Sequence, residues 1–570
     1  MNGLTTAARL ADLAERFWRF ECHEFPLTAI LAGEATRDAT VFREAVADCD
    51  RRHLAAGEML AELHHIAVDS LTAQDRATHR LLHRALEGIR SFHEVVAHYR
   101  PSLFPAGPDF TTVYFANTAS ADSVESAERY LERLATVPAF IRDVMEGLQA
   151  GYTYGIRYPR PVLDRAIANT RGMIAGAVES SPWCGPFKRS TAAGRAAVRR
   201  AGDGALALIR GELLPALQAY ADLLEGPLAR GARSTLACTD APLGREFYLV
   251  LARNFTTTDL GPEEIHELGL AEVARLNGEI EAVANDAGFA GDATAHRRLL
   301  SSDAQFIVAS KEELRDKLES LCKRIDKRIP AFFGRIPRIT YGIETMPEAM
   351  SASMPPAYAQ PNPADGSAPG IFWVTSDPKK CPSYMHLPLA LHEAWPGHLM
   401  HIALMQEMEG LPKFRRHGAV KYTACVEGWA LYCERLGVDM GLFETPHQHY
   451  GRLNMEIWRA VRMVVDTGIH WHGWSRDRAV EYMAQHVTLA REMIEAEVDR
   501  YVALPGQALA YQIGNLKFRA LRQRAEQTLG DQFSFRTFHD EMMAAGPVTL
   551  PVLEELVDDW LSRQATGVHP

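Results

Sequence analysis

Two histidines and a carboxylate lie within seven residues at the end of an apolar run, in the segment His392–His398 (HEAWPGH). Two neutral imidazoles and one carboxylate form a sufficient protein ligand set for a catalytic zinc, with one coordination position left for water. Glu393 directly follows the first histidine, and we expect it to be the general base that takes a proton from this water. The chemistry indicated is the attack of an activated water on a carbonyl group.

The spacing of the two histidines is unusual, because they lie six residues apart instead of the four that place two rings on one helical face. On a regular helix the second ring would point about 240° away from the first. Proline interrupts the helical hydrogen-bond ladder and glycine tolerates unusual torsions, so Pro396 and Gly397 offer a solution. We predict a kink or local bulge that returns His398 to the face of His392.

An acidic segment begins at Glu427, 29 residues after His398, and ends at Glu434. Its two glutamates are seven residues apart and share a helical face. One could therefore bind the metal while the other orients a ligand histidine through a hydrogen bond. Glu434 could equally be a solvated helix carboxylate. His401 lies on about the opposite face of an undistorted helix from His392, which favours an orienting or structural role.

The bulk composition narrows the class of protein. With 570 residues the chain can bury large cores, and 47% apolar with 23% charged residues is typical of a folded, soluble protein. The net charge of −11 disfavours a nucleic-acid-binding protein. The eight cysteines show no CxxC spacing, which favours a reduced, cytoplasmic protein. We find no signal peptide and no apolar run of about 18 residues, and we expect no membrane association.

Apolar residues at three- and four-residue steps, such as Leu10, Leu13 and Phe17, predict successive helices through the first 230 residues. Further helix starts are expected near Pro262 and at Ser310, where Ser-Lys-Glu-Glu matches a capping box. The glycine-bounded stretch 226–231 is a plausible connection. It would divide an N-terminal helical region, 1–230, from a helical metal-binding catalytic region, 231–570, although the two could form one integrated domain.

Residues 334–375 differ from the rest of the chain. Residues 338–343 and 370–375 are rich in β-branched and aromatic side chains between Gly and Pro breaks, and we predict two or more short strands there. The proline-rich residues 355–361 between them cannot form a regular helix. A small β-sheet is therefore expected beside the metal-binding helix.

Several further motifs accompany the His392–His398 segment over most of the chain. They are Pro356-Ala357-Tyr358, Gly366 to Val374, Glu427-Gly428-Trp429-Ala430-Leu431-Tyr432, Arg462, Val465-Asp466-Thr467-Gly468, His470, Gly473-Trp474, Glu497-Val498-Asp499-Arg500-Tyr501 and Pro505-Gly506-Gln507-Ala508-Leu509-Ala510-Tyr511. In this combination the chain resembles the DUF885 family, a mainly bacterial group named for its unknown function and related to zincin-type metallopeptidases.

The resemblance implies a mainly α fold, similar to the long-helix zincin-like metallopeptidases that enclose a deep channel. It also implies that His392, His398 and Glu427 bind the metal and that Glu393 is the base. This chain departs from the pattern at Leu399 and His401, where family members commonly carry His and Gln, and within 376–387. These departures could mark a subgroup that acts on something other than peptides.

The expected reaction is hydrolysis of an amide or peptide bond in a short peptide or small amide. Tyr511 is the first candidate for the donor that steadies the oxyanion, with His470, Tyr501 and Arg500 as further candidates. Arg462 or Arg500 could clamp a substrate carboxylate, since a guanidinium fork fits that geometry. The alternatives are an internal ion pair for each arginine and a buried, hydrogen-bonded role for Tyr511.

Two competing hypotheses remain open at the level of sequence. Two histidines and a carboxylate also describe non-haem iron enzymes, although the neighbouring Glu393 favours hydrolysis. A helical binding protein with a vestigial site is the third hypothesis, and the intact ligand set argues against it. We therefore expect zinc, with iron or manganese as alternatives. The sequence leaves open the substrate, the point of cleavage and the oligomeric state.

Overall fold

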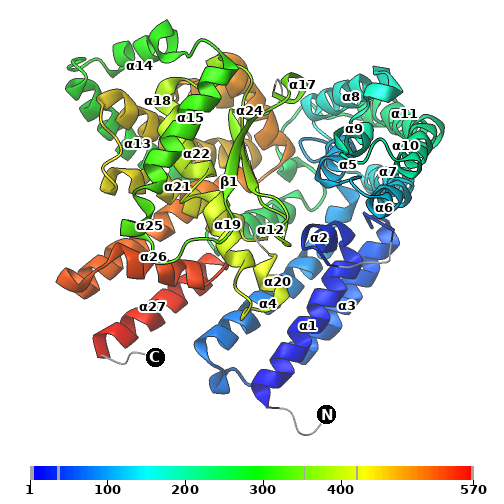
Figure 1. Ribbon diagram of the computed structural model, residues 1–570, viewed down its shortest axis with the longest axis horizontal. Helices are drawn as coiled ribbons and strands as arrows, with labels where there is room; N and C mark the ends of the chain where they lie inside the picture. Colours follow the sequence, from blue (N-terminus) through cyan, green and yellow to red (C-terminus); the bar gives the residue numbers. More distant parts are fainter. Residues whose placement is uncertain (1–4, 35–38, 352–353, 419–420, 567–570) are drawn as a thin grey trace.

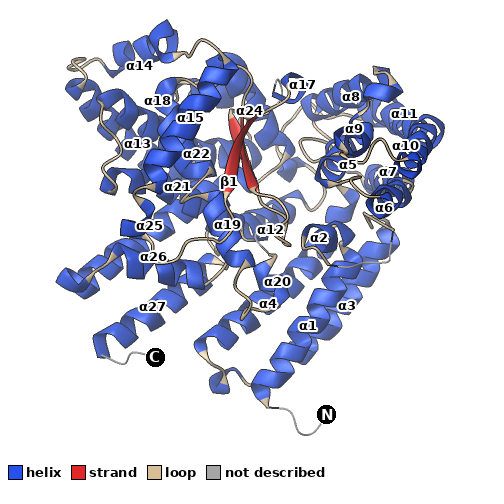
Figure 2. Cartoon of the chain, viewed as in Figure 1, coloured by secondary structure: helices blue, strands red, loops and turns tan. Residues whose placement is uncertain are grey.

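The computed structural model describes residues 5–34, 39–351, 354–418 and 421–566, and it is mainly α-helical with one small sheet (Figure 1; Figure 2). This confirms the predicted fold class; the enclosing channel stays a prediction. The helices up to residue 230 are α1 (Thr6–Glu24), α2 (Pro26–Leu31), α3 (Val46–His64), α4 (Ala73–Glu94), α5 (Pro108–Thr118), α6 (Val124–Leu134), α7 (Val137–Tyr154), α8 (Arg160–Ala175), α9 (Gly185–Arg189), α10 (Ala196–Leu208) and α11 (Leu214–Leu223).

The second part of the chain supplies the elements around the HEAWPGH segment. Its helices are α12 (Gly244–Thr256), α13 (Pro262–Asp286), α14 (Ala293–Ser302), α15 (Lys311–Asp326), α16 (Ile329–Phe332), α17 (Glu348–Ser351), α18 (Ser383–Glu393), α19 (His398–Gln406), α20 (Lys413–Arg416), α21 (Thr423–Asp439), α22 (Pro446–His470), α23 (Arg476–His486), α24 (Arg491–Ala503), α25 (Ala510–Leu529), α26 (Phe535–Ala544) and α27 (Leu550–Thr566). Figure 1 shows α5 to α11 on the right of the view and α13, α15, α21 and α22 on the left.

Local sequence signals explain where several helices begin. Pro262 occupies the first turn of α13, and the Gly261 N–H donates to the Glu264 carboxylate at 2.7 Å. At α15 the Ser310 hydroxyl accepts from the Glu313 N–H at 3.1 Å, as the capping-box motif predicts. The return hydrogen bond differs from that motif, because the Glu313 carboxylate accepts from the N–H of Ala309 at 2.9 Å.

β1 (Tyr341–Thr345) and β3 (Gly370–Val374) lie at or near the predicted strand positions. A third strand, β2 (Ala357–Gln360), lies in the proline-rich stretch between them, and the sheet has the order β1-β3-β2. β1 runs parallel to β3, with Tyr341 opposite Gly370, and β2 runs antiparallel to β3. Figure 2 shows this sheet in red among helices. A side chain at Gly370 would come within 2.8 Å of Leu399 in α19, so the sheet packs closely against this helix, as expected.

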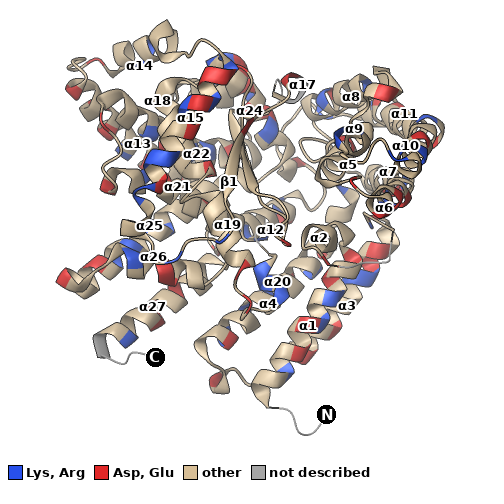
Figure 3. Cartoon of the chain, in the orientation of Figure 1, with Lys and Arg blue, Asp and Glu red and all other residues tan. Residues whose placement is uncertain are grey.

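The main hydrophobic core joins residues from both predicted regions, from Leu10 in α1 to Leu561 in α27. α27 also returns to the N-terminal part, where Arg76 of α4 lies 3.1 Å from the Asp559 carboxylate. The division at residue 230 stays a prediction. Figure 3 shows both acidic and basic residues along α1, α3 and α15. Among the described helices, none combines the length and apolar character that a membrane crossing requires.

Every residue of α22 from Tyr450 to His470 is buried. Helices that are buried on every side are usually apolar all round. This one instead carries a row of buried polar residues at steps of three and four. The row consists of Arg452, Glu456, Arg459, Arg462, Asp466 and His470. The charged side chains of α22 therefore lie in the protein interior and not at the solvent-exposed surface.

α21 and α25 approach each other at backbone contact distance. A Cβ added to Gly428 would lie 2.4 Å from the Cα of Gly514, and a Cβ on Gly514 would lie 1.9 Å from the carbonyl oxygen of Ala424. Only glycine fits at these two crossing points. The contact sets the distance between the residues that follow or precede these glycines, including Glu427 on α21 and Tyr511 on α25.

This packing predicts that Gly514→Ala lowers the free energy of unfolding by about 3 kcal/mol, because a backbone carbonyl cannot move away as a side chain can. Denaturant unfolding of the two proteins measures the difference. Gly278→Ala in α13 is the matched control, since nothing lies within 4 Å of its added Cβ. That control should gain about 0.5–1 kcal/mol from helix propensity. Equal stability of Gly514→Ala and the wild type would contradict the contact.

Candidate metal centre

The predicted distortion between the two histidines is a complete break between two helices. α18 ends at Glu393 and α19 begins at His398. Gly397 lies so close to the preceding helix end that a Cβ on it would stand 1.9 Å from the carbonyl oxygen of His392. The chain therefore folds back on itself, which a side chain at this position would prevent. As a result, the two imidazoles lie with ring centroids 4.8 Å apart and planes at 88°.

The fold-back places both rings beside Glu427 of α21. The Glu427 Oε2 atom lies 3.5 Å from His392 Nε2 and 3.3 Å from His398 Nε2. One ligand atom from each of the three residues lies within 4.8 Å of the others. A tetrahedral zinc with bonds of 2.0–2.1 Å separates its ligand atoms by about 3.3 Å. The two measured separations are therefore close to those that a bound zinc requires.

Glu434 lies on the other side of His392, and its Oε1 is 2.8 Å from His392 Nδ1. With the Nδ1 proton donated to this carboxylate, the Nε2 lone pair points toward Glu427. Burial lowers the pKa of His392, but the Glu427 and Glu434 carboxylates outweigh it and raise the pKa to about 9. The carboxylates thus favour a cation at Nε2, which is either a proton or a metal ion in its place.

Two polar atoms of the cluster are shielded from solvent without a hydrogen bond from any described residue. They are Glu427 Oε2 and His398 Nδ1. Burial raises the pKa of Glu427, but the imidazoles of His398 and His392 hold it well below its usual value. A shielded carboxylate oxygen without a donor carries a free-energy cost, which a cation would remove. The residues present therefore fit a metal ion.

The predicted base and oxyanion donor both lie near this cluster. Glu393 is the last residue of α18, is 7% exposed, and its charge contributes to the raised pKa of His392. Tyr511 lies at the start of α25 and accepts from Gln507 Nε2 at 3.3 Å. Burial raises the pKa of Tyr511, and Glu427 raises it further. Tyr511 thus lies within electrostatic reach of Glu427.

The predicted substrate-binding residues Arg462, Arg500 and Tyr501 all contact one carboxylate, Glu497. Arg462 Nη2 and Arg500 Nη2 each lie 3.0 Å from Glu497 Oε2, and the Tyr501 hydroxyl donates to the same oxygen at 2.6 Å. Burial raises the pKa of Glu497, but Arg500 and Arg462 hold it far below its usual value. The arrangement is the internal ion pair that was the alternative for both arginines. Arg462 Nη1 has no hydrogen-bond partner among the described residues.

His470 was a candidate catalytic residue, and both of its ring nitrogens are occupied. Its Nδ1 accepts from the Cys238 N–H at 3.1 Å, so Nε2–H donates to the Tyr501 carbonyl at 2.9 Å. The ring is fully buried, and burial lowers its pKa to about 4. We therefore leave His470 out of the chemistry and consider it a residue that fixes the backbone at Tyr501.

His401 lies in α19 with 1% of its surface exposed, and its ring centroid is 5.8 Å from that of Trp429. The Trp429 Nε1–H donates to the Pro396 carbonyl at 2.9 Å. This hydrogen bond ties α21 to the turn between α18 and α19. His401 is not in the group of three metal-capable residues. Its ring packs near Trp429 beside this turn, which fits a structural role.

Arg459 was missed by the sequence argument. It lies one turn before Arg462 on α22 and is 5% exposed. Burial lowers its pKa, while Glu434 and Glu427 oppose that shift. Arg459 therefore lies within electrostatic reach of the acidic residues of the centre. The three- and four-residue steps of polar residues along α22 are the signal that could have pointed to it.

Comparison with known proteins places the chain in a family. Residues 26–557 match the family model "Bacterial protein of unknown function (DUF885)". The chain belongs to the DUF885 family. No protein of curated function matches it. This DUF885 protein is similar to the solved structure of a "putative lipoprotein" from Colwellia psychrerythraea, at 25% identity and a TM-score of 0.91 over 98% of this chain and all of that one.

Two further solved structures are similar to this DUF885 protein. A "putative lipoprotein of unknown function" from Shewanella oneidensis is 18% identical, with a TM-score of 0.70 over 97% of this chain and all of that one. At this identity the likeness concerns the fold alone. Trypanosoma cruzi metallocarboxypeptidase 1 is 11% identical, with a TM-score of 0.36 over 99% of this chain and 96% of that one. That similarity is too low to support an inference from its activity.

The prediction of a cytoplasmic location is wrong by these comparisons. The structures from Colwellia psychrerythraea and Shewanella oneidensis are both described as lipoproteins. Lipoproteins are anchored to membranes and do not belong to the cytoplasm. The prediction rests on cysteine spacing and on the composition of the first residues, and neither reports on a lipid anchor.

The buried His470 predicts a pH dependence of stability for this DUF885 protein. As the pH falls, the unfolded chain binds a proton near the ordinary value of 6.5, whereas folded His470 does so only at about 4. Stability is therefore lost between these values. From pH 7 to pH 5 this one residue should account for about 2 kcal/mol.

Gln at position 470 can accept from Cys238 and donate to Tyr501, but it does not titrate. The stability difference between the wild type and His470→Gln should therefore shrink by about 2 kcal/mol from pH 7 to pH 5, measured by urea unfolding. His65→Gln, at an exposed position at the end of α3, should match the wild type at both pH values. A constant difference between the wild type and His470→Gln would contradict the assignment.

Proposed function

We propose that this protein is a metal-dependent hydrolase that cleaves an amide or peptide bond in a short peptide or another small amide. The observation that carries the proposal is the convergence of ligand atoms from His392, His398 and Glu427 within 4.8 Å, with Glu393 adjacent to the first ligand. Family membership is compatible with this function but does not define it, because the family is one of unknown function.

The proposed holders of the ion are His392 and His398 through Nε2, and Glu427 through Oε2. Two imidazoles and one carboxylate suit zinc best, with iron or manganese as alternatives. When bound, the ion would supply a water of lowered pKa and would polarise the carbonyl group of the substrate. Glu434 holds the His392 ring in orientation through the 2.8 Å contact at Nδ1.

The remaining steps belong to side chains of the protein. The Glu393 carboxylate accepts a proton from the attacking water and passes it to the departing amine nitrogen. The Tyr511 hydroxyl is the proposed donor to the oxyanion, and its raised pKa keeps it protonated at neutral pH. The unpartnered Arg462 Nη1 is the group available to a substrate carboxylate, while Nη2 stays paired with Glu497.

The same three ligands also suit non-haem iron enzymes, so the ligand set alone does not choose the reaction. Glu393 favours hydrolysis, because an oxygenase has no general need for a carboxylate base beside its first ligand. Metal analysis of protein purified in air separates the two reactions. Zinc supports hydrolysis, whereas stoichiometric iron would favour oxygen chemistry.

The central test is Glu393→Gln, which removes the base and leaves the three ligands in place. We expect unchanged metal content and a loss of turnover of about 10²–10⁴-fold, the usual contribution of a general base. Since the substrate is unidentified, untargeted metabolite profiling compares the wild type with the variant. The wild type should convert one depleted compound into an acid and an amine.

Glu409→Gln is the matched control for this experiment, because Glu409 is exposed in the turn after α19. It should behave as the wild type in both metal content and product formation. Identical product profiles for the wild type and Glu393→Gln would remove Glu393 as the base. Undiminished metal in both His392→Ala and His398→Ala would remove the metal site itself.

A second test concerns the residue that orients the first ligand. Glu434→Gln keeps a hydrogen-bond acceptor for His392 Nδ1 but loses the negative charge, and metal affinity should fall about 10–100-fold. Competition with a chromogenic chelator measures this affinity. Glu444→Gln, at an exposed position after α21, is the control and should bind metal as the wild type does. Equal affinities in all three proteins would show that Glu434 does not act on the centre.

A further inference from the structure

A second group of metal-capable side chains lies in the N-terminal part of the chain, on elements that contribute nothing to the first centre. Asp50 is on α3, His93 is in the last turn of α4, and His98 is in the short 3-10 helix η2 (Ala97–Tyr99). One ligand atom from each residue lies within 4.8 Å of the others. The closest pair is His93 Nε2 and Asp50 Oδ1, at 2.8 Å.

The backbone makes a sharp reversal to bring His98 to this position. Val96 follows α4 and has φ 51 and ψ 41, in the left-handed region. A β-branched residue rarely adopts this conformation. The reversal brings the His98 ring next to that of His93, with centroids 4.8 Å apart and planes at 19°. His53, one turn after Asp50, stacks on His93 at 4.3 Å.

The imidazoles of this group have unused nitrogens. His98 Nδ1 and His53 Nδ1 are both shielded from solvent and have no hydrogen-bond partner among the described residues. A metal ion binds an imidazole through the lone pair of such a ring nitrogen. Among the three residues of the group, His98 therefore has a ring nitrogen without a hydrogen-bond partner among the described residues.

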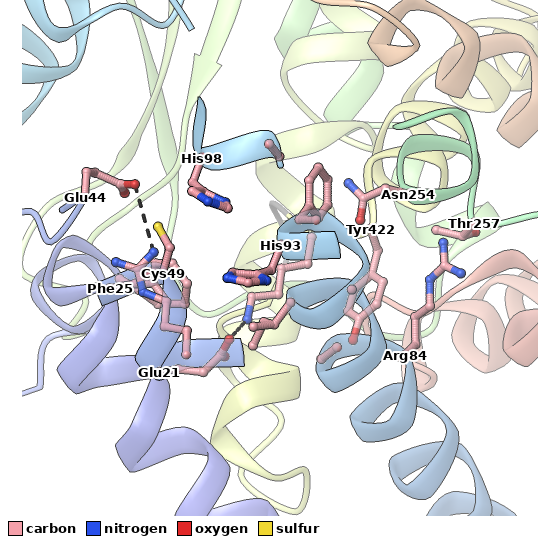
Figure 4. A pocket seen from close by; sticks show the side chains of 18 residues that line it. Glu21, Phe25, Glu44, Cys49, Arg84, His93, His98, Asn254, Thr257 and Tyr422 are labelled. Atoms are coloured by element: carbon pink, nitrogen blue, oxygen red, sulfur yellow. Dashed lines mark hydrogen bonds and ion pairs between the residues drawn. The ribbon is translucent and has the colours of Figure 1, made fainter. Parts of the chain in front are cut away.

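The group also borders a cavity of about 530 Å³, which His93 and His98 line together with Cys49, Arg52, Glu44 and Lys421. Figure 4 shows the two imidazoles directed into this pocket from neighbouring turns of the chain. Asp50 does not line the cavity and is exposed to solvent. The group thus lies between the cavity and the surface.

We propose that Asp50, His93 and His98 form a second metal site, distinct from the first centre, for a divalent transition ion of the zinc type. Two imidazoles and one carboxylate select such an ion over calcium or magnesium, which prefer oxygen ligands alone. Three protein ligands leave a coordination position for water. The ion joins α3, the end of α4 and η2, so its binding stabilises the turn around Val96.

The test is zinc binding by full-length protein from which metal has been removed with a chelator. After equilibrium dialysis against Zn²⁺, elemental analysis should find one equivalent less in His98→Ala than in the wild type. His83→Ala is the matched control, because His83 is a partly exposed histidine of α4 outside the group. It should bind as much zinc as the wild type. Equal zinc content in His98→Ala and the wild type would overturn the proposal.

A second arm separates this site from the first centre and does not require activity. In a His392→Ala/His398→Ala background, one zinc equivalent should remain, and Asp50→Asn should remove it. Asp50 is exposed, so this substitution leaves the packing intact, and circular dichroism verifies the fold. Zinc should also raise the melting temperature of the double variant but not that of the triple variant. No zinc in the double variant, or equal zinc in both, would overturn the second site.

Discussion

The backbone of Gly397 rests against the carbonyl group of His392, and the candidate centre depends on this contact. It allows the chain to end one helix and start another within four residues, so that two rings six positions apart share one space. The hydrogen bond from Trp429 to the Pro396 carbonyl then fixes α21 against the same turn. Glu427 arrives through that helix, two positions before the tryptophan. A single achiral residue thus permits the assembly of all three ligands.

The centre concentrates buried charge that must be balanced within the protein. The negative charges belong to Glu393, Glu427 and Glu434. Together they raise the pKa of His392 and so favour its imidazolium form. α22 brings Arg459 into electrostatic reach of the same carboxylates. Its neighbour Arg462 is paired with Glu497. Buried charges without partners are costly in free energy. A cation between His392, His398 and Glu427 would balance part of the negative charge of the buried carboxylates.

The sequence predicted much of the helical architecture, the strands near 338–343 and 370–375, and the meeting of His392, His398 and a glutamate. The helices and strands among these features depend on local patterns, such as the Ser310 cap, that tertiary contacts do not override. Other features depend on residues far apart in the chain. Glu427 and Glu434 share a helical face, so their spacing does not show which one faces the metal. The structure distinguishes them, because the His392 ring lies between them with Nε2 toward Glu427 and Nδ1 toward Glu434.

The same limit explains His470 and α22. Cys238 and Tyr501 occupy the ring nitrogens of His470 from distant segments, so its spacing could not reveal that it has no free nitrogen. The polar residues of α22 follow the period of a solvent-exposed face, yet other helices cover them.

Gly428 and Gly514 hold α21 and α25 at backbone contact distance. These two helices therefore form one rigid unit, and the hydrogen bond from Trp429 to the Pro396 carbonyl attaches the α18–α19 turn to it. Any motion that admits a substrate would then have to come from other elements, while the two histidines, Glu427 and Tyr511 keep their relative positions.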